Sequence, residues 1–249
     1  MCIETEDDLA GMRAAGHVVR LALEAMRVAV EPGISTAQLD TIGARIFAQH
    51  GARSAPSLVY DFPGTNCISV NDEIVHGIPS KKRVLASGDL VKLDVTAELN
   101  GYMADAAITV PVGRVSARAQ KLIDCAEAAF EKAMREVRPG KRMLDVGGAV
   151  EHEVVRQGFS VVRVLTGHSI GRTIHEDPMV PNWADPTARE WLTDGLVITV
   201  EPIITMGHGD CYESDDGWTI LTQDGSLAAH FEQTLVVTKG RPILLTAAA

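Results

Sequence analysis

The sequence lacks the features that mark several large classes of protein. Its 249 residues contain four cysteines, and no two of them are spaced as a CxxC pair, so we expect free thiols in a reducing compartment. No apolar run approaches the ~18 residues that a membrane-spanning helix needs. The first residues, MCIETEDDLAGM, are acidic and have no apolar segment of the kind that a secretory signal carries. These absences predict a cytoplasmic protein without membrane contact.

Positive charge is also in short supply. Lys and Arg number 23 against 33 Asp and Glu, which gives a formal net charge of -10. Proteins that bind nucleic acid need clustered Lys and Arg to neutralise phosphates, so we expect no direct nucleic-acid partner. Apolar residues make up 46% of the chain, an ordinary share for a globular protein of a length that can bury a sizeable core.

An internal repeat organises the chain. Residues 30–33 (VEPG) recur as residues 137–140 (VRPG). Each copy continues into a helical pattern that ends in a glycine, at Gly51 in the first copy and at Gly158 in the second. The alternative is a chance similarity between two helix–strand patterns.

The repeat extends to acidic residues at the ends of β-rich stretches. The stretch that ends at Asp94 (GDLVKLD) matches the one that ends at Glu201 (GLVITVE). The stretch that begins at Asp105 (DAAITV) matches the one that begins at Glu232 (EQTLVV). We therefore predict a single α+β domain in which two similar halves cover a shared sheet with helices, the domain being 1–249 and the halves about 20–113 and 127–240.

The acidic residues of the first half lie close together if the chain between them forms a hairpin. The dipeptide at 100–101 (NG) favours a two-residue turn. Thr96 then faces Asp105, and Asp94 becomes its diagonal neighbour on the same face of the sheet. An ionised carboxylate in a buried strand must be paired or bound to a cation. Lys92 is the one basic residue inside these strands, so a two-metal site explains the acids better than ion pairs do.

Two histidines lie in a glycine-flanked segment, residues 166–175 (TGHSIGRTIH). The glycines indicate backbone that closely approaches another group. Because the chain also has four acids that we expect to be buried, we expect either His168 or His175 to be a fifth metal ligand. The other imidazole would be free for acid–base catalysis or hydrogen bonding.

Taken together and in order, these motifs resemble the type I methionine aminopeptidase family within the "pita-bread" metallopeptidases. The resemblance runs over nearly the whole chain and rests on the segments 71–79 (NDEIVHGIP), 93–96 (LDVT) with Asp105, 167–178 (GHSIGRTIHEDP), 199–202 (TVEP), 216–219 (DGWT) and 231–234 (FEQT). It implies two pseudo-twofold halves around a curved antiparallel sheet. It also implies an aminopeptidase that removes the first methionine from nascent polypeptides, at the ribosome, when the second residue is small. Nothing in the sequence demands more than a monomer, so we expect one.

The resemblance implies roles for individual residues and a cofactor of two divalent ions, which are Co, Mn, Fe, Zn or Mg. The residues that match the metal ligands are Asp94, Asp105, His168, Glu201 and Glu232, with Asp105 and Glu232 bridging both ions. The residues that match substrate contacts near the scissile bond are His76 and His175, and Glu201 is also the expected proton shuttle. The residues that match the wall of the methionine pocket are Phe62, Cys67 and Trp218. Thr96 would orient the carboxylates.

The chain departs from the family pattern at a few positions. Ser169 stands where glycine is usual, Ile174 replaces an aromatic residue, and the Glu232 ligand is preceded by His230 and followed by Gln233 where the family has glutamine before and histidine after. These departures bear on pocket shape and on the tuning of the ligands. Two alternatives remain, a peptidase of the Xaa-Pro aminopeptidase or prolidase kind and a non-catalytic binding module on the same fold.

Overall fold

The computed structural model describes residues 1–247, which fold around one large antiparallel sheet and two small ones. The helices are α1 (Glu6–Ala29), α2 (Thr36–His50), α3 (Ala55–Tyr60), α4 (Ala117–Ala133) and α5 (Met143–Gln157). The strands are β1 (Arg53–Ser54), β2 (Cys67–Val70), β3 (Glu73–Val75), β4 (Leu90–Leu99), β5 (Tyr102–Pro111), β6 (Ser160–Val161), β7 (Gly167–Ser169), β8 (Glu176–Val180), β9 (Val197–Val200), β10 (Ile203–Thr205), β11 (Cys211–Glu213), β12 (Ile220–Thr222), β13 (Ala228–His230), β14 (Glu232–Val236) and β15 (Ile243–Leu244).

The helices begin and end where the sequence supplies caps. Ser35 Oγ accepts a hydrogen bond from the backbone N–H of Gln38, and the backbone N–H of Ser35 donates to Gln38 Oε1. The two bonds form a capping box at the start of α2. Helix α2 ends at Gly51 and α5 ends at Gly158, both in the left-handed conformation at φ 68° and 85°. The glycine stops expected from the sequence are thereby confirmed.

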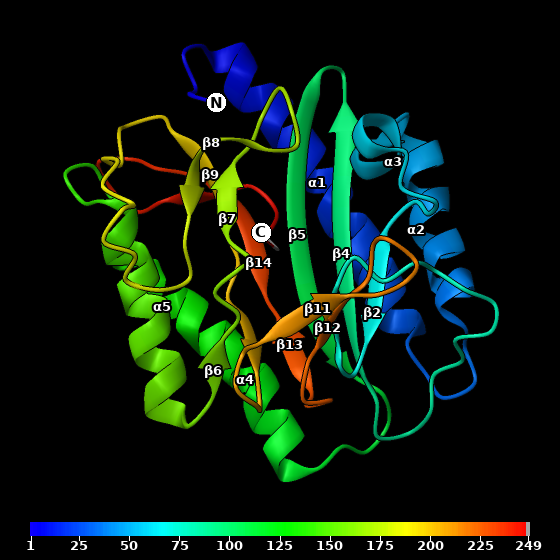
Figure 1. Cartoon of the computed structure of the whole chain (residues 1–249). Helices are drawn as coiled ribbons and strands as arrows, with labels where there is room; N and C mark the ends of the chain where they lie inside the picture. The colour runs from blue at the N-terminus through cyan, green and yellow to red at the C-terminus, as the bar shows by residue number, and fades with distance from the viewer. Residues whose placement is uncertain (248–249) are drawn as a thin grey trace.

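The hairpin of β4 and β5 contains the two longest strands of the large sheet, which runs in the order β1-β4-β5-β14-β9-β7-β8 (Figure 1). Leu99 pairs with Tyr102 across a two-residue turn. Asn100 and Gly101 make that turn with φ of 52° and 81°, a conformation that asparagine and glycine adopt readily. Thr96 therefore lies opposite Asp105, in the register that the sequence predicts.

Each half of the chain contributes a pair of helices. Helices α1 and α2 pack on each other, and α1 packs on β4 and β5, whereas α4 and α5 pack together over the strands of the second half (Figure 1). Strand β14 joins the halves because it pairs with β5 on one side and β9 on the other. The same order of two helices followed by acidic strands occurs in both halves. Their origin by duplication stays a prediction.

The absences noted in the sequence have simple structural counterparts. All four cysteines are free thiols. Among residues 1–247, none of the helices combines the length and the apolar character that crossing a bilayer requires.

Candidate active site

The side chains expected to bind metal converge from separate strands on one hollow of about 200 Å³. The five residues that meet there are Asp94 of β4, Asp105 of β5, His168 of β7, Glu201 directly after β9, and Glu232 at the start of β14. Among them, Asp105, His168 and Glu232 each offer a ligand atom, and these three atoms lie within 4.8 Å of one another. The sheet order thus brings together residues that are far apart in the sequence.

Burial strongly favours the protonated form of these acids in the absence of a cation. It raises the pKa of Asp94, Glu201 and Glu232 well above the usual range, and the negative charge of the neighbouring carboxylates raises it further. Burial raises the pKa of Asp105 to about 7, although hydrogen bonds with Thr96 and Asp94 partly oppose the shift. Nearby positive charge is what would hold all four carboxylates ionised at neutral pH.

Two oxygens of the cluster show directly that the side chains fit a metal. Asp105 Oδ1 and Glu232 Oε1 are fully buried and have no hydrogen-bond partner within the described residues. No Lys or Arg of residues 1–247 forms an ion pair with any of the four acids. Such buried acceptors are costly unless a cation or a donor reaches them. A set of carboxylate oxygens with an imidazole is suited to divalent ions.

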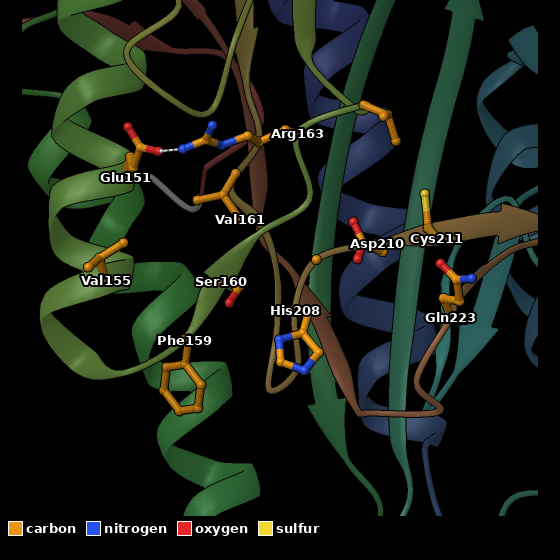
Figure 2. Close-up of a pocket in the computed structure, with 12 residues that line it drawn as sticks. Glu151, Val155, Phe159, Ser160, Val161, Arg163, His208, Asp210, Cys211 and Gln223 are labelled. Atoms are coloured by element: carbon orange, nitrogen blue, oxygen red, sulfur yellow. Dashed lines mark hydrogen bonds and ion pairs between the residues drawn. The ribbon is translucent and has the colours of Figure 1, made fainter.

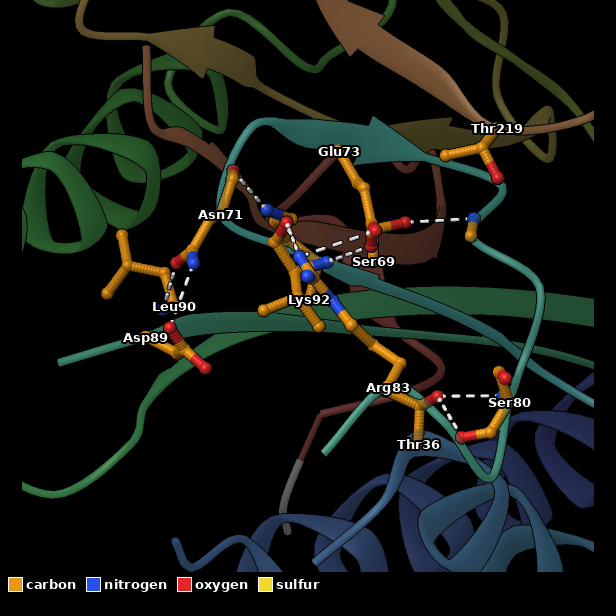
Figure 3. Close-up of polar contacts among 12 residues, drawn as sticks. Thr36, Ser69, Asn71, Glu73, Ser80, Arg83, Asp89, Leu90, Lys92 and Thr219 are labelled. Atoms are coloured by element: carbon orange, nitrogen blue, oxygen red, sulfur yellow. Dashed lines mark hydrogen bonds and ion pairs between the residues drawn. The ribbon is translucent and has the colours of Figure 1, made fainter. Parts of the chain in front are cut away.

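Lys92 precedes Asp94 by two positions on β4 and so shares its face of the sheet. Its ammonium nevertheless binds elsewhere, beside Asn71 (Figure 3). Its ammonium donates hydrogen bonds to the backbone carbonyls of Asn71, at 2.7 Å, and Ala228, at 3.4 Å. It therefore ties the turn between β2 and β3 to β13, and these segments lead to His76 and His230. Burial lowers the pKa of Lys92 to about 7, and the negative charge of Glu73 partly offsets the shift. The ion-pair explanation of the acids is thus excluded for Lys92.

The lowered pKa of Lys92 predicts a change in stability with pH. The unfolded chain keeps the Lys92 proton up to about pH 10.5 and the folded chain up to about pH 7. Between these values the unfolded state binds more protons, so the contribution of Lys92 to stability rises with pH by up to ~1.4 kcal/mol per unit. The free energy of unfolding of the protein minus that of Lys92→Met should therefore increase from pH 7 to pH 9.5 in denaturant titrations. The exposed Lys239→Met is the control, and an equally flat difference for both variants would contradict the prediction.

The two histidines expected to contact substrate lie beside the metal-binding residues. The rings of His168 and His175 are 4.2 Å apart between centroids. His76 follows β3 with a left-handed φ of 59°, and it lines the same hollow. Burial, followed by the charge of His175, lowers the pKa of His76 to about 4, and burial also lowers the pKa of His175. Both imidazoles are therefore neutral at pH 7.

Two further residues of the site were missed in the sequence. The Tyr60 hydroxyl lies 2.6 Å from His175 Nδ1. The Thr199 hydroxyl donates to Glu201 Oε1 at 2.9 Å and accepts from the backbone N–H of His168 at 3.0 Å. Thr199 precedes Glu201 by two positions, as Thr96 follows Asp94 by two, and this shared spacing was a signal that could have found it. Tyr60 carries no such signal, because only the fold brings α3 to His175.

The expected pocket wall is partly assembled. Phe62 and Trp218 meet edge to face with ring centroids 5.1 Å apart. Cys67 pairs with Asp94 across β2 and β4, and burial, followed by the charges of Asp94 and Asp105, raises the pKa of its thiol. None of these three wall residues is among those that line the hollow of the acids.

The residues that depart from the family pattern are all buried, but they differ in whether they reach the hollow of the acids. Ser169 donates its hydroxyl hydrogen to the backbone carbonyl of Val197 at 2.8 Å, and Ile174 is buried in the apolar core. Gln233 accepts a hydrogen bond from the hydroxyl of Thr246 at 2.7 Å, away from the acids. His230 lines the hollow itself.

A second hollow of about 530 Å³ adjoins the first (Figure 2). Glu151 and Arg163 form an ion pair at its edge. Val164 lines both hollows and is the one residue that they share. The residues that line the second hollow include no cluster of buried acids, so the candidate metal site lies in the first hollow.

The antiparallel sheet and the buried acids around one hollow define a metal-dependent hydrolase of the pita-bread class. Residues 10–239 match the family model described as metallopeptidase family M24, and the chain belongs to this family.

Two similar proteins share one activity by name. Methionine aminopeptidase 2 of Bacillus subtilis (strain 168) is 45% identical over 247 residues, which cover 99% of each chain. The crystal structure of a methionine aminopeptidase from Thermotoga maritima matches with a TM-score of 0.96 and 35% identity, over 100% of both chains. The expected fold class is confirmed.

A prolidase from Pyrococcus furiosus shares the fold at a greater distance. Its TM-score is 0.79 at 20% identity, over 100% of this chain and 66% of the prolidase. This likeness extends to the fold alone. The Xaa-Pro alternative therefore has weaker support than a methionine aminopeptidase activity has from the two proteins above.

Proposed function

We propose that the chain is an aminopeptidase that removes the N-terminal methionine of polypeptides by metal-assisted hydrolysis. The observation that carries the proposal is the convergence of four carboxylates and His168 on one hollow. Three of the carboxylates are buried and that of Asp94 is half-buried, and none has a Lys or Arg partner among residues 1–247. The identity of 45% to a methionine aminopeptidase over 99% of each chain supports this choice among metallopeptidases.

Divalent metal would be held by five side chains that line the hollow, namely Asp94, Asp105, His168, Glu201 and Glu232. When bound, divalent ions supply Lewis-acid polarisation of the scissile carbonyl and lower the pKa of water toward neutrality. Co, Mn, Fe, Zn and Mg all remain candidates, because carboxylate-rich sites accept each of them.

Glu201 and His175 would perform the proton and hydrogen-bond steps. Glu201 carries a proton from the attacking water to the leaving amine, and the Thr199 hydroxyl fixes its Oε1. Burial raises the pKa of Tyr60, so the phenol stays protonated and donates to His175 Nδ1. The proton of the neutral imidazole is then on Nε2, from which it donates to the oxygen of the scissile carbonyl. His76 contacts the peptide nitrogen.

Substrate choice would follow from the groups that line the site. The free amino group of the substrate binds at the acids, which limits cleavage to the first peptide bond. Phe62, Cys67 and Trp218 form the wall for the methionine side chain, and a bulky second residue would crowd the hollow. The partners are nascent polypeptides at the ribosome, and we propose a monomer acting in the cytoplasm.

A mass-spectrometric assay with three tripeptides tests this function. Met-Ala-Ser should lose its methionine when the protein is supplied with Co²⁺, Mn²⁺, Fe²⁺, Zn²⁺ or Mg²⁺ in turn, and a chelator should abolish the cleavage. Met-Lys-Ser and Ala-Pro-Ser should stay intact. Cleavage of Ala-Pro-Ser instead would indicate the Xaa-Pro class. A folded protein that binds none of these metals and cleaves no peptide would indicate a binding module.

A further inference from the structure

His230, the last residue of β13, presents a buried imidazole that the proposed ligand set does not use. The residue is 2% exposed, and its ring lines the hollow of the acids. Its backbone is fixed, because its N–H donates to Thr109 Oγ1 and its carbonyl accepts from the same hydroxyl, both at 2.8 Å. Both ring nitrogens, however, lack a hydrogen-bond partner within the described residues. A polar ring buried in this way is costly unless something in the hollow binds it.

The position of the ring identifies what that partner is. His230 Nε2 lies 3.5 Å from Glu232 Oε2 and 3.9 Å from Glu201 Oε2. His168 Nε2 lies 3.7 Å from the other oxygen of the same carboxylate, Glu201 Oε1. Nitrogen and oxygen donors about 2 Å from a shared ion are separated from each other by roughly 3–4 Å. His230 therefore stands in the same relation to Glu201 as the proposed ligand His168 does, on the opposite oxygen.

The surroundings of the ring offer no competing partner. Ile203 is opposite His230 in the pairing of β10 with β13, and it is apolar and buried. Two basic groups act on the ring by their charge: His76 lines the same hollow, and Lys92 donates its hydrogen bonds to the carbonyls of Asn71 and Ala228. Glu232 Oε2 lies 3.5 Å from the ring, and the other oxygen of that carboxylate, Oε1, also has no hydrogen-bond partner within the described residues. Imidazole and carboxylate are thus left facing the same small space.

We propose that His230 is a sixth metal-binding side chain, which adds a second imidazole to the centre beside Glu201 and Glu232. This inference rests on the metal-dependent function proposed above. Imidazole ligands favour Fe, Co, Ni and Zn, whereas sites made of carboxylates and water suit Mg and Mn. His230 accordingly shifts the preference of the centre toward the nitrogen-binding metals, and the glutamine that the family has at this position would not.

Calorimetric titration of the metal-free full-length protein and of His230→Gln tests the proposal. We expect His230→Gln to bind Co²⁺ and Zn²⁺ at least ~10-fold more weakly at one of two sites, the scale seen when groups that support a metal are lost. Mn²⁺ binding should change less than threefold, and the visible absorption of the Co²⁺ form should shift. His76→Gln, which removes another imidazole of the hollow, and His208→Gln, which removes an exposed one, should retain the Co²⁺ affinity of the unaltered protein.

A second measurement needs no variant and covers the case in which His230→Gln fails to fold. X-ray absorption of the unaltered protein loaded with two Co²⁺ ions should show two imidazoles per pair of ions. One imidazole per pair, or a His230→Gln protein with unchanged Co²⁺ affinity and spectrum, would overturn the role of His230 while leaving the proposed function standing. An unaltered protein that binds no metal would overturn both.

Discussion

Asp105→Asn should abolish peptide cleavage, with kcat/KM for Met-Ala-Ser reduced on the order of 10³-fold or more, the scale of losing a principal electrostatic group of an active site. Asp105 lies between the two halves of the ligand set, opposite Thr96 and within reach of His168 and Glu232. Asparagine has the same shape but offers one neutral acceptor oxygen, so it cannot bridge two cations as a carboxylate does. Steady-state assays with saturating metal, together with a metal count per chain, measure the effect.

Asp194→Asn is the matched control for this variant. Asp194 lies at the surface, where it forms a loose ion pair with Lys239 at 3.8 Å. Replacing it with asparagine makes the same chemical change outside the hollow. Its kcat/KM and metal content should match those of the unaltered protein. If Asp105→Asn kept activity within tenfold and still bound two ions, Asp105 would have no place in the centre.

The part of this site that the sequence reveals is the part set by local geometry. The turn at Asn100 and Gly101 fixes the register of β4 against β5, and the two-residue period of a strand then puts Asp94 and Asp105 on one face. Glu201 and Glu232 could be added because the acidic ends of the strands recur in the second half. Each of these steps uses a spacing of a few residues or a comparison between similar segments.

The parts that the sequence does not reveal depend on long-range packing. Tyr60 reaches His175 because α3 packs near β4. Lys92 lies in the same strand as Asp94 and could be expected to pair with the acids, but its ammonium donates to two backbone carbonyls instead. In the sequence, His230 stands out only as a change in residue type near Glu232. That its buried ring has no hydrogen-bond partner can be seen only in the folded structure. Side-chain direction within a crowded interior is what residue patterns do not encode.

The largest expected effect on stability comes from the same replacement in the metal-free protein. Burial raises the pKa of Asp105 to about 7 from an ordinary value of 3.8, so at neutral pH the folded state binds more protons than the unfolded state. The contribution of Asp105 to stability is thus complete below pH 3.8 and is lost as the pH rises through 7. Asparagine resembles the protonated acid at every pH. With chelator present, Asp105→Asn should match the unaltered protein below pH 3.8, exceed it increasingly as the pH rises from there to about 7, and exceed it by the full amount at pH 8.

The size of this difference follows from the shift in pKa. Each unit corresponds to ~1.4 kcal/mol, so the advantage of Asp105→Asn at pH 8 should reach several kcal/mol, or on the order of 10 °C in Tm for a chain of this size. The difference between the two proteins is the quantity to measure, because the lowered pKa values of Lys92, His76 and the buried His168 add to both proteins a contribution to stability that rises with pH.

Added metal should reverse the order of the two proteins. Cations bound to the ionised carboxylates replace the protons, so saturating Co²⁺ should raise the Tm of the unaltered protein, and more strongly at pH 8 than at pH 6. Asp105→Asn should gain much less. A chelated unaltered protein as stable as Asp105→Asn at pH 8 would mean that Asp105 has a favourable partner of its own, and the four acids would then not be a site held ready for cations. The low stability of the metal-free cluster and its affinity for metal have the same cause. Metal binding requires several carboxylates to be buried close together, and without cations their negative charges repel one another.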